Sequence, residues 1–285
     1  MLSGYIPAAV TPFKNGKVDF DALGSYIEWL ENQGISTMVL CGSTGESLSL
    51  TLEEQTEILK FASGIIKGNL IGGVIWSTTD NCLQIIKNTE EYVSGFLCIC
   101  PFYVKPTQTQ IVAHFKKLSS STKKSIVVYN NPSRVGVTIE KNAFDQLIDI
   151  ENIVAIKECS PDLFRFTLWR PLKAFSMLTG NDDSASGALA MGADGVISVS
   201  ANIYPKLCIR GYEAFKNRED FSKYRDLLAP VHELMFREPS PAPAKYALSK
   251  MGLMANELRS PLGPISSDLA RRIDGYMEWM SDVKV

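Results

Sequence analysis

Short apolar runs that suit β-strands alternate with amphipathic, helix-like segments along most of this 285-residue chain. A repeated strand, helix, strand order is typical of a parallel sheet covered by helices. The expected strands are, in order, residues 4–10, 37–42, 70–75, 95–100, 125–130, 153–158, 175–180 and 195–200. The alternation therefore predicts an α/β fold with eight parallel strands.

The helix-like segments between these strands are marked by their spacing and by their end signals. Apolar residues recur every three or four positions, as at Phe20, Leu23, Ile27 and Leu30, which is the period of an amphipathic helix. Residues suited to start a helix are Thr51 with Glu54, Thr107 with Gln110, and Ser160 followed by Pro161. Glycines suited to follow a helix end are Gly34 and Gly192.

Eight strand and helix units within about 215 residues match the usual length of a closed (β/α)8 barrel. We therefore predict a TIM barrel. The main alternative is an open doubly wound sheet, whose dinucleotide-binding form carries a GxGxxG sequence after the first strand. This chain has no such sequence there, which favours the barrel.

The chain continues well beyond the expected barrel. Three further segments have helical spacing: 219–236, 242–252 and 266–281. The proline-rich sequence EPSPAP interrupts them at 238–243. We predict a catalytic barrel domain over residues 1–217 and a C-terminal helical segment over residues 218–285, packed on the barrel.

Composition narrows the class of protein. A formal net charge of -2, with no block of like charge, gives no support to a nucleic-acid surface or a polybasic membrane patch. The chain has no basic residue before Lys14 and no apolar run as long as a membrane span, so we expect a cytoplasmic protein. The six cysteines form no CxxC pair and are interpreted as buried free thiols. Because the chain has just two histidines, His114 and His232, we expect no metal site.

In a closed barrel the ligand site lies at the C-terminal ends of the strands, and Lys157 lies close to the end of the sixth. It follows four apolar residues in the sequence IVAIKE and shares one strand face with Ala155. That face is directed either into the barrel or towards the helices, and periodicity does not decide between the two. Directed outwards, the amine would simply reach water. Directed inwards, a partly desolvated amine would be neutral often enough to attack a carbonyl and form a Schiff base.

Two loops at the same end of the barrel carry polar groups. GSTGES at 42–47 lacks the lysine of a P-loop and the GxSxG of a serine hydrolase, but its amides, with Ser43 and Thr44, suit a small carboxylate. Tyr129 ends the fifth strand, and Arg134 follows on a short loop where it would clamp a carboxylate. As a simple turn and a core tyrosine, these features need no ligand. With histidine scarce, proton transfer would fall to a tyrosine.

The order and spacing of these motifs resemble a known enzyme family. GSTGES, PFY at 101–103, YNNPSR at 129–134 and the lysine of IKE occur together as in the dihydrodipicolinate synthase and N-acetylneuraminate lyase family of pyruvate-dependent class I aldolases. The resemblance runs from PAAVTPF near the start to EPSPAPAKYALSKMGL and RSPLGPI near the end. It implies a homotetramer built as a dimer of dimers, and it implies no cofactor.

The resemblance also implies a role for each motif residue. Lys157 would condense with pyruvate, Tyr129 would donate and accept protons, and Ser43 would be the relay hydroxyl. Tyr103 would complete the relay from an adjoining subunit. The implied substrate contacts are Thr44 for the pyruvate carboxylate, Arg134 for the carboxylate of aspartate semialdehyde, and Gly180 and Ile197 along the pocket.

The implied reaction condenses pyruvate with L-aspartate 4-semialdehyde to 4-hydroxy-tetrahydrodipicolinate, the branch point of diaminopimelate and lysine synthesis. The arginine in the PSR segment favours this synthase branch, because sialate lyases usually lack it. Ser43 is also the sialate-lyase form, so another pyruvate aldolase, such as N-acetylneuraminate lyase or a keto-deoxy-sugar aldolase, is the alternative. A third hypothesis is a barrel that senses a keto acid or amino acid and in which Lys157 is unreactive.

Some residues depart from the family pattern. Asn181 replaces a usual aspartate, and Cys159 follows the lysine motif where a small residue is usual. The residues that align with the effector site of lysine-inhibited relatives are Leu52, Gln55, Ser77, Asn81 and Phe102. They offer few charged partners to the ammonium and carboxylate of an amino acid. We therefore expect weak or absent feedback inhibition by lysine.

Overall fold

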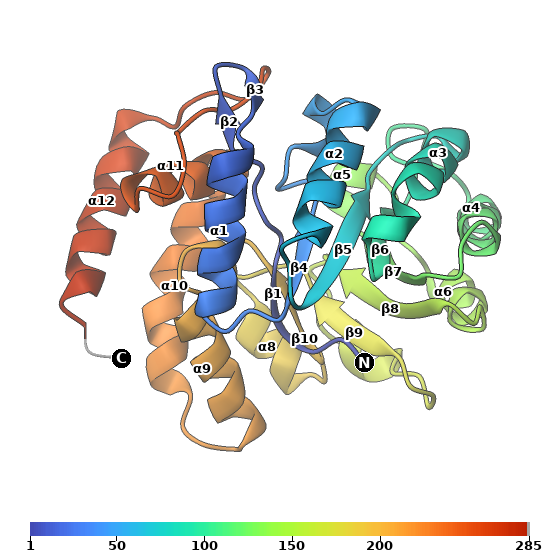
Figure 1. Ribbon diagram of the computed structural model, residues 1–285. Helices are drawn as coiled ribbons and strands as arrows, with labels where there is room; N and C mark the ends of the chain where they lie inside the picture. Colours follow the sequence, from blue (N-terminus) through green and yellow to red (C-terminus); the bar gives the residue numbers. More distant parts are fainter. Residues whose placement is uncertain (284–285) are drawn as a thin grey trace.

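The computed structural model describes residues 1–283, and within them eight parallel strands form one sheet. The strands are β1 (Gly4–Pro7), β4 (Thr37–Leu40), β5 (Asn69–Val74), β6 (Gly95–Ile99), β7 (Ser125–Asn130), β8 (Ile153–Glu158), β9 (Ser176–Thr179) and β10 (Gly195–Ser198). Their order in the sheet is β1, β10, β9, β8, β7, β6, β5, β4. An isolated bridge between Ala8 and Val39, with the Ala9 N–H donating to the Val39 carbonyl at 2.9 Å, joins the two end strands. The result is a nearly closed (β/α)8 barrel (Figure 1), which confirms the predicted fold class.

Each strand of the barrel is followed along the chain by at least one helix. These helices are α1 (Phe20–Asn32), α2 (Leu52–Ser63), α3 (Thr79–Thr89), α4 (Gln108–Ser120), α5 (Pro132–Val135), α6 (Lys141–Ile148), α7 (Arg165–Leu168), α8 (Ala185–Ala190) and α9 (Pro205–Lys216), with 3₁₀ turns η1 (Ser47–Ser49), η2 (Glu90–Tyr92) and η3 (Ser200–Asn202). In α1 the buried side chains are Leu23, Ile27 and Leu30, as the apolar spacing predicts, together with Tyr26, while the predicted Phe20 is half-buried. Each fully buried aliphatic side chain contributes about 1.5–3 kcal/mol, which fixes this face of the helix against the barrel.

The helix ends follow the predicted signals at four positions. Thr51 opens α2 and Thr107 opens α4, and both have the two reciprocal hydrogen bonds of a capping box. Gly34 follows α1 with φ 98°, and Gly192 follows α8 with φ 108°. A glycine adopts this left-handed conformation without the clash that a Cβ would cause.

The helix start predicted at Ser160 and Pro161 is wrong. The Glu158 carboxylate accepts a hydrogen bond from the Ser160 N–H at 2.7 Å, and this bond holds the chain in a turn. Asp162 then caps the Phe164 N–H at 3.1 Å, and α7 begins only at Arg165. A serine before a proline therefore mimics a helix start when a nearby carboxylate takes the serine amide.

A small hairpin that the strand pattern did not predict follows β1. Its strands, β2 (Phe13–Lys14) and β3 (Lys17–Val18), pair antiparallel across a tight turn in which Asn15 and Gly16 have φ 53° and 76°. In Figure 1 this hairpin and α5 lie at the upper end of the barrel, which is the end reached by the C-termini of the strands.

The three C-terminal segments with helical spacing are helices, α10 (Ser222–Phe236), α11 (Ala242–Lys250) and α12 (Ser267–Ser281), and they lie along one side of the barrel (Figure 1). Val231, Leu234 and Met235 of α10 belong to the same buried apolar cluster as the barrel strands. This side chain packing makes α10 part of the barrel core.

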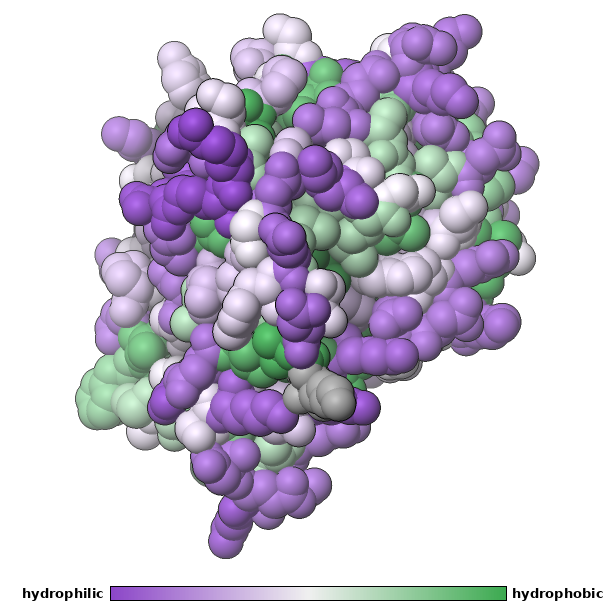
Figure 2. Space-filling view, turned by 90° about the vertical axis from the view of Figure 1, so that its left-hand side faces the viewer, coloured by the Kyte–Doolittle hydropathy of each residue, from purple (hydrophilic) through white to green (hydrophobic). Residues whose placement is uncertain are grey.

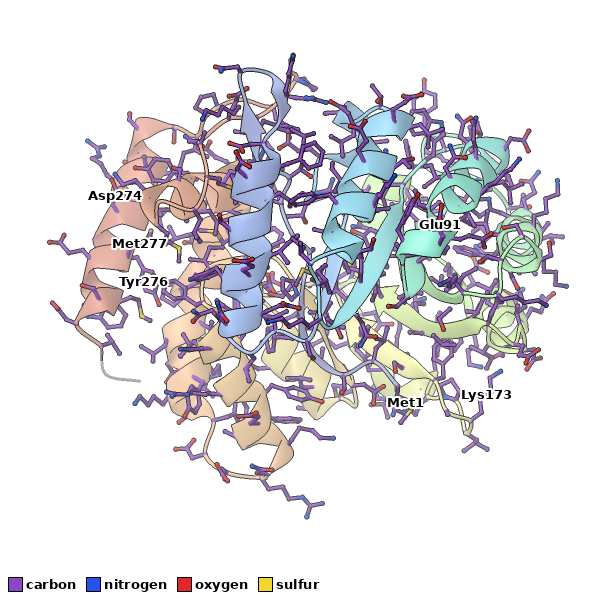
Figure 3. All side chains as sticks on the ribbon, viewed as in Figure 1. Met1, Glu91, Lys173, Asp274, Tyr276 and Met277 are labelled. Carbon is purple, nitrogen blue, oxygen red and sulfur yellow. The ribbon has the colours of Figure 1, made fainter. Side chains whose placement is uncertain are left out.

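Hydrogen bonds attach α12 to the other two C-terminal helices. The Tyr276 hydroxyl donates to the Leu227 carbonyl of α10, and the Tyr246 hydroxyl of α11 donates to Asp274 at 2.9 Å. Figure 3 shows Asp274 and Tyr276 on α12, across the molecule from Lys173. The face formed here is mainly hydrophilic, with apolar groups between the polar side chains (Figure 2).

The described cysteines and helices bear on two further expectations. Within residues 1–283 all six cysteines are free thiols; Cys159 is half-buried and the other five are buried, so the interpretation as free thiols is confirmed. Among these same residues, none of the helices combines the length and the apolar character that crossing a membrane requires.

Candidate active site

The structure brings Lys157 and Tyr129 together at adjacent strand ends. β7 and β8 are parallel neighbours, and Tyr129 is the register partner of Lys157. Both side chains are buried, with exposed fractions of 4% for Tyr129 and 6% for Lys157. The Lys157 Nζ lies 4.5 Å from the centroid of the Tyr129 ring. The amine and the phenol that the sequence singles out are thus neighbours in an environment with little access to water.

The next residues along both strands show which way this pair is directed. Asn130 and Glu158 are also register partners, and the Asn130 Nδ2 donates to both Glu158 carboxylate oxygens, at 2.7 and 2.9 Å. The Glu158 Oε2 lies 3.1 Å from the Nε of Arg165, on the outer helix α7. Because neighbouring strand residues point to opposite faces, Lys157 and Tyr129 are directed into the barrel. This resolves the alternative that periodicity left open.

Two opposing effects act on the pKa of Glu158, the carboxyl directed away from the barrel interior. Burial raises the pKa of the Glu158 carboxyl, and the Arg165 guanidinium opposes that rise. Since the carboxylate also holds Asn130 and the Ser160 N–H, it connects the end of β7, the end of β8 and α7. A charged group with this many partners fixes the register of the two strands that carry Tyr129 and Lys157.

Gly180, at the end of β9, leaves the space into which the Lys157 side chain extends. A Cβ at this position would lie 2.3 Å from the Lys157 Cε and 2.2 Å from the Cys159 Sγ, so no side chain fits without moving them. Burial raises the pKa of the Cys159 thiol to about 11, against the opposing charge of Lys157, which keeps the thiol protonated near neutral pH. Ile197, on β10, is 1% exposed and pairs with Ile6 of β1.

The loop GSTGES follows β4 and carries Ser43, which is half-buried, and Thr44, which is buried. Its backbone is tightly wound: the Glu46 N–H donates to the Ser43 carbonyl at 3.2 Å, and Glu46 has φ 54°. A Cβ at Gly45 would lie 3.1 Å from the Ala9 carbonyl oxygen. The loop therefore passes close to the backbone after β1, and a side chain at this position would be crowded.

Ser43 and Arg134 line the same cavity, of about 460 Å³. Its other walls include residues 46–49 of the loop region after β4, Ile99 and Phe102 from the end of β6, and residues 239–240 and 261–262 of the C-terminal segment. Ile99 is the register partner of Tyr129, which places the cavity next to the buried pair. Lys157 and Tyr129 themselves are not among the residues that line it. A cavity of this size suits a small organic substrate.

Arg134 and Tyr129 are connected through the start of α5. Asn131 caps this helix and its Nδ2 donates to the Tyr129 hydroxyl oxygen at 2.8 Å. Arg134 itself is exposed. Asn131 thus holds the Tyr129 hydroxyl, and Arg134 places an exposed cation at the wall of the cavity.

Tyr103, like Arg134, is a predicted site residue that a single chain leaves at the surface. Its side chain is 90% exposed and its backbone has φ 72°, a conformation that non-glycine residues rarely adopt. Val104, the next residue, is 63% exposed. A strained loop with two exposed apolar side chains is typical of an interface.

Sequence reasoning missed a buried ion pair next to the GSTGES loop. The Lys245 Nζ donates to the Glu46 carboxylate, and neither side chain has any exposed surface. Burial lowers the pKa of the Lys245 ammonium, and the Glu46 charge opposes this change. A signal was present in the sequence: Lys245 stands within the otherwise apolar run PAPAKYAL, where a charged residue requires a partner.

The described residues contain no group of three or more His, Cys, Asp or Glu side chains arranged to hold a metal ion.

Comparison with known proteins identifies the family. A model of the dihydrodipicolinate synthetase family matches residues 1–278 of the chain. The chain belongs to this family. A relative from Parvibaculum lavamentivorans, named 4-hydroxy-tetrahydrodipicolinate synthase, is 35% identical over 97% of this chain and 98% of its own.

Solved structures of family members share the whole fold. Dihydrodipicolinate synthase from Thermotoga maritima has a TM-score of 0.95 at 31% identity, and the match covers 99% of both chains. A monomeric dihydrodipicolinate synthase variant has a TM-score of 0.94 at 31% identity, over 99% of this chain and 98% of its own. The family fold therefore extends over the C-terminal helices as well as the barrel.

Proposed function

We propose that this protein is a class I, Schiff-base aldolase that condenses pyruvate with L-aspartate 4-semialdehyde to give 4-hydroxy-tetrahydrodipicolinate, in diaminopimelate and lysine biosynthesis. Family membership and the names of the relatives support the reaction. The observation that carries the chemistry is the inward Lys157 amine, buried 4.5 Å from the Tyr129 ring centroid. The reaction needs no cofactor, because the iminium formed on lysine is itself the electron sink.

In this proposal Lys157 attacks the keto carbon of pyruvate, water leaves, and an iminium forms. Tyr129 removes a proton from the methyl group, and the resulting enamine attacks the aldehyde carbon of the second substrate, whose oxygen takes up a proton. Ser43 and the partner subunit's Tyr103 pass protons between Tyr129 and solvent. The amino group of the added substrate then attacks the iminium carbon, which closes the ring and releases Lys157.

The substrate contacts follow from the same arrangement. We propose that Thr44 and its neighbouring amides bind the pyruvate carboxylate, and that Arg134 at the cavity mouth binds the carboxylate of aspartate semialdehyde. Gly180 gives the lysine room beside the bound pyruvate, and Ile197 forms an apolar wall. In this proposal a hydroxyl and backbone amides hold one carboxylate, an arginine holds the other, and the reacting carbons lie in an apolar setting.

We also propose an assembly of at least a dimer, and a homotetramer as its full form, located in the cytoplasm. The exposed Tyr103 and Val104 support an interface at this loop. In the same proposal residues 1–217 carry the catalytic groups and residues 218–285 form the packed C-terminal segment.

Trapping the Schiff base tests the central step. Incubation with pyruvate and borohydride, followed by peptide mass analysis, is expected to reduce the imine and leave one stable adduct on Lys157. The Lys157→Ala variant is expected to show none. An adduct on another residue, or no adduct on the wild type, would refute the mechanism and favour a sensing role.

The second substrate is tested separately, because Ser43 also suits a sialate lyase. Turnover of pyruvate with aspartate semialdehyde is expected to exceed cleavage of sialate by orders of magnitude. Arg134→Ala is expected to raise KM for the semialdehyde by about tenfold or more, as loss of a charge-assisted bidentate contact would, while pyruvate trapping is unchanged. Faster turnover of sialate would assign the protein to the other branch.

A further inference from the structure

The buried Glu46 and Lys245 ion pair joins the GSTGES loop to the C-terminal helix α11. The Glu46 Oε1 accepts from the Lys245 Nζ, and the Oε2 accepts from the Arg259 N–H at 3.0 Å. Lys245 also donates to the Glu257 carbonyl at 2.7 Å. Both oxygens of the carboxylate are therefore held by groups from residues 245–259, outside the barrel.

An aromatic ring completes this arrangement. The Lys245 Nζ lies 4.0 Å and the Arg259 guanidinium carbon 4.5 Å from the centroid of Phe13, which is fully buried. A cation over an aromatic face is attracted to it. The Lys245 ammonium is thus enclosed by a carboxylate, a carbonyl and an aromatic ring. These contacts fix the position of the Glu46 carboxylate.

The position of Glu46 determines that of Ser43 and Thr44. The Glu46 N–H donates to the Ser43 carbonyl at 3.2 Å, which closes a turn directly around Thr44. Glu46 has φ 54°, which is strained for a residue with a Cβ and persists only where surrounding contacts enforce it. Its buried carboxylate supplies those contacts, so a shift of the carboxylate would move the two hydroxyls.

Stability alone does not account for such a pair. Replacing a buried ion pair with apolar groups of similar volume is often neutral or stabilising, because desolvation offsets the attraction. Apolar side chains could not replace the directional hydrogen bonds that hold Glu46 and its strained loop in place.

We propose that Glu46 and Lys245 are positioning residues, which hold Ser43 and Thr44 where they can bind pyruvate and relay its protons. The inference rests on the proposed function and extends it to the C-terminal segment. The proposal predicts different effects on two steps when the ion pair is removed. Lys157 lies on β8, so it still forms the imine. Removal of the methyl proton, which depends on the position of the loop, becomes slower.

The experiment uses the full chain with Lys245→Met, Glu46→Gln and the two combined. Lys141→Met is the matched control, because Lys141 pairs with Asp145 on the surface, where its side chain is 48% exposed. Three quantities are measured: the fraction of sites trapped by pyruvate and borohydride, the exchange of pyruvate methyl protons in D2O by NMR, and hydrogen exchange of peptides covering residues 42–47.

In both single variants and the double variant we expect near-normal trapping by pyruvate and borohydride. Methyl-proton exchange per trapped site should fall by at least about tenfold. The KM for pyruvate should rise, and hydrogen exchange in residues 42–47 should be faster. The control should match the wild type. Methyl-proton exchange per trapped site equal to that of the wild type would overturn the inference.

Two further outcomes are decided in advance. If Lys245→Met does not fold, Glu46→Gln, which keeps the shape of the side chain, is judged by the same criterion. If the wild type shows no trapping, the proposed function fails, and hydrogen exchange still decides the inference: unchanged protection of residues 42–47 in the variants overturns it, and lost protection supports the positioning of the loop.

Discussion

Gly180 sets the room available to Lys157, and its replacement should act on chemistry more than on folding. In Gly180→Ala the new Cβ would meet the Lys157 Cε and the Cys159 Sγ at 2.3 and 2.2 Å, and both are side-chain atoms that can move aside. We expect a stability loss within about 1–3 kcal/mol and a fall of at least about tenfold in turnover, because a misplaced nucleophile reacts slowly. A steady-state assay of the condensation and thermal unfolding measure the two effects.

Gly275→Ala is the matched control. Gly275 lies in α12, with nothing within 4 Å of an added Cβ. We expect wild-type turnover and a stability gain of up to about 1 kcal/mol, from the higher helix propensity of alanine. Equal loss of turnover in both variants would contradict the assigned role of Gly180.

His114, on α4, is a buried titratable residue that the proposed mechanism does not use. Burial lowers the pKa of its imidazole from 6.5 to about 4, and its Nδ1 lies 2.9 Å from the Thr79 hydroxyl. The unfolded chain therefore binds a proton here between these two values while the folded chain does not, so stability falls as pH falls through this window.

From about pH 6.5 to about pH 5 this residue should lower the free energy of unfolding by up to about 2 kcal/mol. In His114→Gln that part of the pH dependence is expected to disappear. Urea unfolding of both proteins at the two pH values measures it, and parallel pH dependence in the two proteins would show that His114 keeps an ordinary pKa.

The sequence identified Lys157 and Tyr129 but could not orient them. Strand alternation is symmetric, so it says which residues share a face and not which face is inside. The orientation depends on Asn130, Glu158 and Arg165, which meet only in the folded chain. The pairing of Glu46 with Lys245 could not be predicted either, because these two residues also meet only in the folded chain.

At the scale of elements, α2 and α3 border a cavity of about 220 Å³ that bears on regulation. Leu52, Gln55 and Asn81, three of the five positions aligned with an effector site, line it, and no charged side chain does. Among the residues that the structure describes, the Gln55 Oε1 is a buried acceptor without a hydrogen-bond partner, which would suit an ammonium group, but none of the residues lining this cavity carries a positive charge to neutralise a carboxylate. Ser77 and Phe102 line other cavities.

We therefore expect sub-millimolar L-lysine to leave the initial rate nearly unchanged. A steady-state assay across a lysine series tests this, with the condensation followed at fixed substrate concentrations. Half-inhibition at sub-millimolar lysine would mean that charged groups from a second subunit complete the site.

Strands and capped helices were predicted well because their signals are local. Thr51 and Thr107 interact with residues three positions away, and the eight apolar runs each contain a strand. The hairpin β2 to β3 and the turn after Glu158 were missed, because each depends on a few polar contacts rather than on a periodic pattern. Element boundaries follow tertiary contacts as much as propensity.

At the scale of the whole molecule, the exposed Tyr103 predicts that active sites are shared between subunits. Lys157→Ala and Tyr103→Phe should each have little activity alone. If Tyr103 acts across the interface, mixing the two should create hybrid dimers with one intact site, and random pairing restores about a quarter of wild-type activity in a symmetric dimer.

Mixing after mild dissociation, followed by activity and sedimentation measurements, tests this. The unmixed variants, treated alike, are the controls. Hybrid dimers without restored activity would show that Tyr103 serves its own chain or none.

The contact between Glu46 and Lys245 spans 199 positions, and this has a consequence for how the protein is made. Synthesis proceeds from the N-terminus, and domains begin to fold as they emerge. The GSTGES loop emerges early, yet its anchor leaves the ribosome only after every barrel strand has done so. A nascent or prematurely terminated chain would then contain Lys157, but its GSTGES loop would not yet be held in position. Activity on pyruvate would therefore require a nearly full-length polypeptide.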